Sequence, residues 1–443
     1  MASRVQSQSP ITHRRVLAIA APIVLSNATV PILGAVDTGV VGQMGEAAPI
    51  GAVAVGAMIV TFSYWLFGFL RMGTAGLAAQ AIGAGDDDEA TALLMRGLLI
   101  AAVAGGAVIL LQWPIVELGL LAVSSSPEVE EMARAYASIR LFSAPAAIAV
   151  FAVTGWMIAA ERTGQVLILQ LWMNGLNIAL DLLFVLGLGW EVEGVAIATL
   201  IAEWSGALLG LWLLRACFRG TAWRDRALIL RADRLRRMMA VNGDILIRTL
   251  LLQIGFALFT IRSAAQGEVN LAANHVLLNF LYIIAHALDG FAFAAEALVG
   301  QSLGARNRAR LRRAALMCGF WGMVVSLLLA LAFLLGGPAI IEIMTTSPDV
   351  RAAAMAFLVW LVISAPVSLP SFMLDGVFIG ATRTRDMRNA MIVSLGVYLV
   401  ALFTLPDLMG NHGLWAAMTI LFIARAATLA VKYPALEAEA DAK

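Results

Sequence analysis

Long apolar stretches, separated by short polar or glycine- and proline-rich breaks, fill this chain from residue 15 to residue 432. A helix that crosses a membrane needs roughly 20 apolar residues, and twelve stretches reach that length. The predicted spans are residues 15–42, 50–82, 93–121, 133–159, 165–189, 194–216, 237–264, 271–302, 312–342, 352–380, 388–407 and 412–432. The pattern predicts an all-α integral membrane protein with twelve transmembrane helices.

The composition strengthens this prediction. Of 443 residues, 61% are hydrophobic and 13% charged, whereas soluble domains are about 25% charged. Cys217 and Cys318 stand far apart in the sequence, so they suggest neither a disulfide framework nor a zinc motif. The four histidines are scattered and predict no metal cluster.

Arginines gather in the loops of one side. Cytoplasmic loops of membrane proteins are enriched in Lys and Arg, and the runs before span 1, between spans 6 and 7, after span 8 and after span 10 fall on one side if every span crosses once. Both termini are therefore expected in the cytoplasm, and the expected location is a bacterial inner membrane. Nucleic acid is not expected as a partner, because the chain has no soluble basic domain.

The chain contains an internal repeat. Ser143-Ala-Pro145 returns as Ser364-Ala-Pro366, an offset of 221 residues, and Gln80 to Gly83 returns at the same offset as Gln301 to Gly304. This predicts an N-terminal six-helix lobe (1–216), a cytoplasmic arginine-rich linker (217–236) and a C-terminal six-helix lobe (237–443). Six is even, so the repeat is parallel, with a pseudo-two-fold axis along the membrane normal, an arrangement typical of alternating-access transporters.

The first span contains polar residues that a plain membrane anchor does not need. Asp37 places a carboxylate at membrane depth, which costs roughly 2.5–3.5 kcal/mol on insertion scales and usually serves a function. Asn27 precedes Asp37 by nearly three turns and is a candidate for the cavity lining. Pro22 interrupts the helical hydrogen bonds and is the predicted hinge.

These residues resemble the multidrug and toxic compound extrusion (MATE) transporters. The shared features are Asp37-Thr-Gly-Val-Val-Gly42, the Gln-x-x-Gly ends of spans 2 and 8, and the duplicated Ser-Ala-Pro helices; the stretch 287–301 is similar to the bacterial DNA-damage-inducible-F (DinF) branch. The resemblance covers about residues 14–432. It implies a pair of six-helix bundles that export amphipathic, often cationic organic compounds, driven by inward flow of H⁺ or Na⁺.

The resemblance also implies a cation site in the N-terminal half. The family's site falls on Asp37 in span 1, Asn177 and Asp181 in span 5, and Thr199 in span 6. Asn174, Asn177 and Asp181 share one helical face by their spacing of three and four. Carboxylate, amide and hydroxyl oxygens suit Na⁺, and two close carboxylates also suit a shared proton. The sequence leaves both ions open; we expect H⁺ ahead of Na⁺.

Further polar residues within the predicted spans are candidates for the substrate cavity or for a polar network. Arg71 is expected in an internal ion pair rather than on substrate, and Glu203 shares a helical face with Thr199. A NorM-like branch of the family uses carboxylates of the C-terminal half, including one in span 7, and here span 7 has none at mid-depth. A second site in the C-terminal lobe stays open. Its acidic candidates are Asp289, Glu296 and Asp375.

The leading interpretation is a cation-coupled antiporter without a bound cofactor, surrounded by membrane lipids and acting as a monomer. A second interpretation is a flippase or exporter of lipid-linked or other amphiphilic metabolites, which would need a cationic cavity for pyrophosphate. An integral-membrane enzyme ranks last, because the sequence contains no P-loop, no H-E-x-x-H and no G-x-S-x-G. The chain is therefore expected not to be an enzyme.

Overall fold

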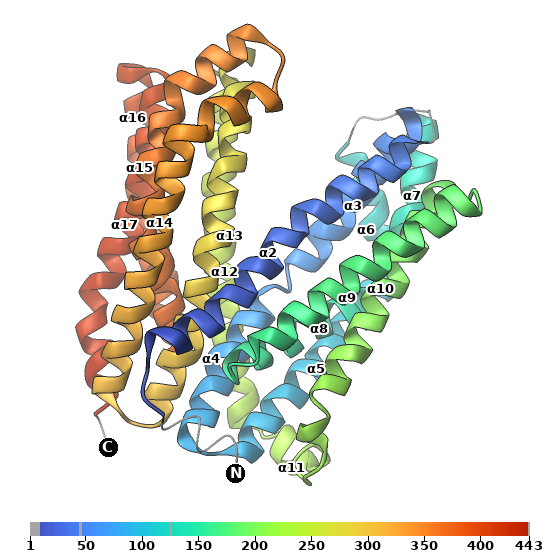
Figure 1. Ribbon diagram of the computed structural model, residues 1–443. Helices are drawn as coiled ribbons and strands as arrows, with labels where there is room; N and C mark the ends of the chain where they lie inside the picture. The colour runs from blue at the N-terminus through green and yellow to red at the C-terminus, as the bar shows by residue number, and fades with distance from the viewer. Residues whose placement is uncertain (1–8, 44–46, 124–125, 442–443) are drawn as a thin grey trace. The chain divides into compact units, whose positions relative to one another are not determined.

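The computed structural model describes residues 9–43, 47–123 and 126–441, and within these the side chains of residues 30–35, 37, 38 and 47 lie outside the description. All regular structure in this part is helical (Figure 1). The first half contains α2 (His13–Gly42), α3 (Ala47–Trp65), α4 (Phe69–Ala84), α5 (Asp87–Leu110), α6 (Gln112–Leu121), α7 (Pro127–Leu141), α8 (Ala144–Ala159), α9 (Thr163–Asp181), the π-helix η1 (Leu182–Gly187) and α10 (Glu191–Leu213). The rest contains η2 (Arg215–Phe218), α11 (Arg226–Ile229), α12 (Ala232–Ala264), α13 (Glu268–Gly304), α14 (Arg308–Met344), α15 (Pro348–Gly380), α16 (Thr384–Met409) and α17 (Asn411–Glu439).

Most of these helices are long and apolar enough to cross a membrane. Ten helices of the described part pass by length and hydropathy, or eleven if α7 and α8, which meet at a bend of 51°, form one broken span. The helix α2 adds a stretch of 30 residues whose side chains are described only in part. The all-helical, multi-pass architecture predicted from the sequence is confirmed.

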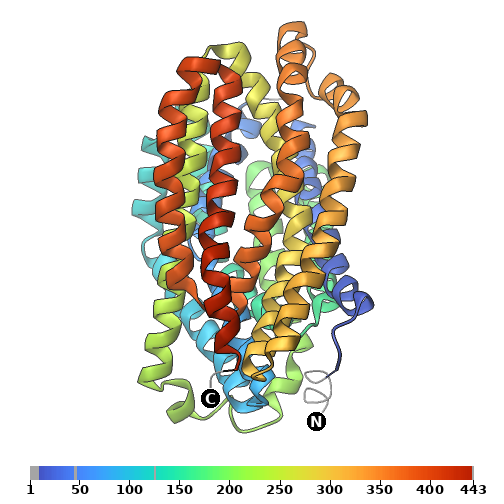
Figure 2. The same cartoon turned by 90° about the vertical axis from the view of Figure 1, so that its left-hand side faces the viewer.

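The chain forms two compact units, each with its own packing. The N-terminal unit comprises Leu25–Ala78 and Asp86–Met238, and the C-terminal unit comprises Met1–Val24, Ala79–Gly85 and Met239–Lys443. In the first, α10 packs against α7, α8 and α9. In the second, α15 packs against α13, α14 and α17, and Figure 2 shows α14 to α17 running side by side. The predicted lobes 1–216 and 237–443 follow chain order and stay a prediction.

The predicted repeat is visible in equivalent close contacts. A Cβ at Gly155 of α8 would collide with the backbone of Arg71 in α4, and one at Gly376 of α15 would collide with the backbone of Ala292 in α13. Both members of this contact are displaced by the same 221 residues. Each half therefore uses a glycine at the same place to bring two helix backbones together.

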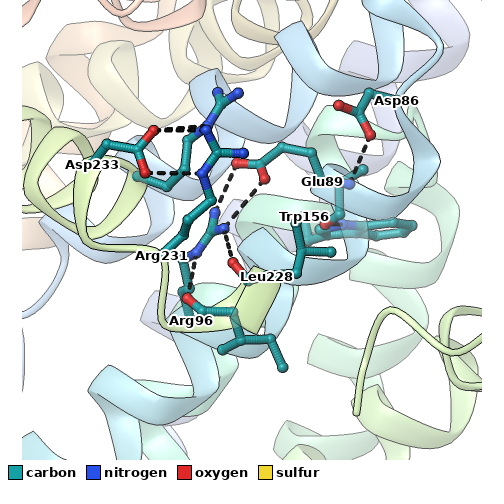
Figure 3. A network of polar contacts seen from close by, with 10 residues as sticks. Asp86, Glu89, Arg96, Trp156, Leu228, Arg231 and Asp233 are labelled. Atoms are coloured by element: carbon teal, nitrogen blue, oxygen red, sulfur yellow. Dashed lines mark hydrogen bonds and ion pairs between the residues drawn. The ribbon is translucent and has the colours of Figure 1, made fainter. Parts of the chain in front are cut away.

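The predicted linker is docked onto the N-terminal unit. Arg96 of α5 is fully buried and donates through Nε to the carbonyl oxygen of Ile229 (2.9 Å) and through Nη2 to that of Leu228 (2.8 Å), at the end of α11. Glu89 neutralises the guanidinium through a bond of 2.7 Å to Nη1 (Figure 3). Burial raises the pKa of the nearby Cys217 thiol in η2 to about 11, so this thiol stays protonated at neutral pH.

Replacing Arg96 should release this segment. We expect Arg96→Met to destabilise the N-terminal unit by about 3–5 kcal/mol, because it leaves Glu89 as a buried charge without its partner. Thermal denaturation of the detergent-solubilised protein measures the change. Arg231→Met is the matched control: its ion pair with Asp233 is about half exposed, and we expect little effect. Equal melting temperatures for the two variants would contradict the docking.

Candidate functional site

A buried amide–hydroxyl pair lies where α9 meets α10. Asn177 is 1% exposed, and its Nδ2 donates to Thr199 Oγ1 across 3.1 Å. The hydroxyl in turn donates to the carbonyl oxygen of Val195, one turn earlier in α10 (2.9 Å). Since these bonds fix the rotation of the amide, Asn177 Oδ1 faces away from Thr199. The structure thus brings together two of the four predicted site residues.

The amide oxygen of Asn177 needs another donor or a cation. Within the part of the chain that the structure describes, Asn177 Oδ1 is buried and has no hydrogen-bond partner. Leaving such an acceptor unsatisfied costs about 1–3 kcal/mol. An oxygen of this kind beside a hydroxyl suits Na⁺, which binds hard oxygen ligands, or a water that carries a proton to a neighbouring carboxylate.

Asp181 follows one turn after Asn177, at the last residue of α9, and is completely buried. The spacing of four places both side chains on the same face of α9, as the sequence predicted. The helix changes to the π-helix η1 directly after Asp181, and single π-turns are frequent at functional sites. Asp181, Asn177 and Thr199 therefore form one polar face inside an apolar bundle.

The fourth predicted member, Asp37, is in α2, but its side chain lies outside the described residues. The helix that carries it is nonetheless tied to the site. Asn174 donates to Thr29 Oγ1 of α2 (2.9 Å) and accepts from Gln170 Nε2 (2.8 Å). Asn174 is thus a network residue that links α9 to the Asp37 helix, and the sequence did not single out either of its two partners.

Glu203 is engaged by an arginine that the sequence analysis did not identify. Arg140 of α7 binds both carboxylate oxygens of Glu203, across 2.8 and 3.0 Å. A lone arginine at membrane depth signals a buried partner, and this signal was available from the sequence. Glu203 therefore belongs to an ion pair one turn from Thr199, and its charge is already balanced.

In the C-terminal unit, Asp375 of α15 lies between two arginines. Its Oδ2 accepts from Arg248 of α12 and from Arg425 of α17, and all three side chains are buried. A carboxylate held by two guanidinium groups is not an open cation ligand. Asp375 is consequently a residue of the internal network and not of a second cation site.

The other candidates stay predictions. Glu296 is buried in α13 and Asp289 is half-buried two turns before it. Arg71 is half-buried in α4, at the close contact with Gly155, and Asn27 is half-buried in α2. The described residues contain no group of three His, Cys, Asp or Glu side chains that could hold a metal ion.

The predicted hinge Pro22 is inside the continuous helix α2. The chain passes from the C-terminal unit to the N-terminal unit between Val24 and Leu25, two residues later. A proline lacks the N–H that would complete the helical hydrogen bond and so allows a bend there. Its place in the chain makes Pro22 a suitable joint, although bending itself stays a prediction.

Comparison with known proteins agrees with this site and fold. The chain is 41% identical to the DNA damage-inducible protein F of Escherichia coli (strain K12) over 425 residues, which is 93% of this chain and 90% of that protein. It is 25% identical to a probable multidrug resistance protein NorM of Pseudomonas aeruginosa, over 93% of this chain and 86% of that protein.

Solved structures share the fold at low identity. An outward-facing multidrug resistance MATE family transporter of the MOP superfamily superimposes with a TM-score of 0.84 at 18% identity, over 96% of both chains. A MOP superfamily transporter from Pyrococcus furiosus Vc1 gives the same values. The MatE family model matches residues 22–183 and 245–404, which include the polar faces of α2 and α9 and most of both repeats. With its two repeats of membrane spans and the polar face on α9, this chain belongs to the MatE family of multidrug and toxic compound transporters.

Proposed function

We propose that this protein is an antiporter that couples the inward flow of H⁺, or less favourably Na⁺, to the export of amphipathic, often cationic organic compounds. The observation that carries the proposal is the buried Asn177–Thr199 pair, whose free amide oxygen shares a helical face with Asp181. The probable multidrug resistance name of the NorM relative supports the substrate class. A bacterial inner membrane with both termini in the cytoplasm follows from the arginine-rich loops.

The site suggests how a cation could drive transport. When the predicted cavity opens outward, Asp37 and Asp181 take up the cation and lose their net charge. The charged-state contacts of α2 are then no longer favoured, so α2 bends near Pro22 and closes the cavity of the N-terminal lobe. Asn174 and Thr29 transmit the change between α9 and α2. Substrate is expelled as the cation binds, and the cation leaves on the inner side.

The flippase interpretation gains no support from the arginines on which it depended. Arg248 binds Asp375, and Arg262 binds Asp407 across 3.4 Å. A guanidinium that is already paired with a carboxylate attracts a pyrophosphate less strongly, since the two anions compete. The two relatives compared above are not enzymes by name, and no catalytic step is proposed.

Counter-transport in proteoliposomes tests the proposal. A fluorescent cationic dye is followed while a pH gradient and a Na⁺ gradient are imposed separately on the wild-type protein. We expect the pH gradient alone to drive the dye against its concentration gradient. Movement driven only by Na⁺ would make the same residues a sodium site. Failure of both gradients would overturn the drug-export proposal.

A further inference from the structure

Four polar residues form a collar across three spans of the N-terminal unit, one turn from Thr199. We define the polar collar as Tyr64 of α3, Arg140 of α7, Ser143 between α7 and α8, and Glu203 of α10. Tyr64 donates to the carbonyl oxygen of Arg140 (2.5 Å), and Arg140 Nη1 donates to Ser143 Oγ (3.1 Å). The bidentate ion pair between Arg140 and Glu203 completes the collar.

The collar lies at two helix breaks. Tyr64 is one residue before the end of α3, where span 2 is interrupted before α4 begins at Phe69. Arg140 and Ser143 flank the 51° bend between α7 and α8 in span 4. Because broken helices leave backbone groups without their regular partners, side chains must satisfy them, and the Tyr64 hydroxyl does this for the carbonyl of Arg140. The collar therefore joins both breaks to α10.

The second repeat provides an internal comparison. At the positions displaced by 221 residues it has Ala285, Leu361, Ser364 and Ala424, which cannot form an ion pair. There the equivalent spans α13 and α15 are continuous helices, even though α15 contains Pro366 of the repeated Ser-Ala-Pro. The collar and both breaks thus occur together, in the half that contains the predicted cation site.

Two further bonds hold the same turn of α10. Trp204 Nε1 donates to the carbonyl oxygen of Phe142 at the bend (3.2 Å), and Trp172 Nε1 of α9 donates to Ser205 Oγ (3.2 Å). Residues 203 to 205 are thereby fixed against α7 and α9. Since Thr199 is one turn away on the face of Glu203, its height and rotation relative to Asn177 are set by these contacts.

We infer that Arg140 and Glu203 are a positioning pair for the cation site. Their ion pair fixes α10 so that Thr199 meets Asn177, and it couples that contact to the breaks in spans 2 and 4. The inference rests on the proposed cation coupling. It assigns to Glu203 a role in placing the ligands, while Asp181, Asn177 and Thr199 contact the ion.

The test measures the concentration of coupling ion that gives half-maximal transport. We expect Glu203→Gln to raise this concentration at least about tenfold, because a misplaced Thr199 weakens ion binding by one decade or more. Arg140→Lys keeps the charge but loses the two-pronged geometry, so we expect a smaller rise. Glu89→Gln is the matched control, since it breaks another buried bidentate pair of the same unit; it should lower the melting temperature and leave the ion concentration unchanged.

Two results would overturn the inference. One is a folded Glu203→Gln protein with the wild-type half-maximal concentration, and the other is an equal rise in Glu89→Gln. If Glu203→Gln does not fold, Arg140→Lys decides by the same criterion. Titration of intrinsic tryptophan fluorescence with H⁺ or Na⁺ in detergent repeats the comparison without transport. The inference can therefore be judged even if no gradient moves the dye and the proposed function fails.

Discussion

Asp181→Asn is expected to abolish ion-driven export while leaving a folded protein. The substitution keeps the size and hydrogen-bonding capacity of the side chain but removes the charge that binds the cation. Loss of a charged interaction worth about 3 kcal/mol reduces ion-driven transport by roughly a hundredfold. Uptake of dye into proteoliposomes under an imposed gradient measures this loss, and dye binding to the solubilised protein should persist.

Two comparisons make this result specific to the site. Asp233→Asn removes an exposed carboxylate at the start of α12 and should transport like the wild type. Asp37→Asn should behave like Asp181→Asn, because both carboxylates are predicted to share the ion. If Asp181→Asn transports normally under the gradient that drives the wild type, Asp181 is a structural residue and the predicted site is wrong.

Asp375→Asn should be the most destabilising substitution in the C-terminal unit. Asp375 balances Arg248 and Arg425 in a buried environment. Without the carboxylate, two guanidinium groups face each other away from water, and breaking a buried pair in this way costs about 3–5 kcal/mol. We expect low expression and a clearly reduced melting temperature in detergent.

Asp407→Asn is the control for this prediction. Asp407 pairs with Arg262 across 3.4 Å, and its side chain is 73% exposed, so its loss should have little effect. The double variant Asp375→Asn with Arg425→Met should recover part of the stability, since one uncompensated charge is gone. An Asp375→Asn protein as stable as Asp407→Asn would contradict the role given to the two arginines.

Much of the fold follows from hydrophobic length and from the repeat. Apolar stretches of sufficient length predicted the spans, and the 221-residue offset predicted that Gly155 and Gly376 occupy equivalent positions. The spacing of Asn177 and Asp181 on one helix correctly placed both on one face. These features depend on local spacing, which a single sequence shows directly.

Contacts between distant segments could not be predicted in this way. Arg140 and Glu203 are 63 residues apart, and Asp375 and Arg425 are 50 apart, so their pairing depends on how the helices pack. Local signals also proved ambiguous: Ser-Ala-Pro accompanies a bend after Arg140, yet the same motif at Pro366 is inside an unbroken helix. The arginine-rich linker gave no sign that Arg96 of α5 holds it.

The most direct test of the central claim is proton release on dye binding. If ion and substrate exclude each other, binding of a cationic dye must displace the ion, because linkage between two sites is reciprocal. The measurement adds dye to solubilised protein in weak buffer with a pH indicator, and repeats it with Na⁺ present. We predict proton release on dye binding to the wild type and none in Asp37→Asn or Asp181→Asn. Dye binding without release of protons or competition by Na⁺ would contradict cation-coupled antiport through this site.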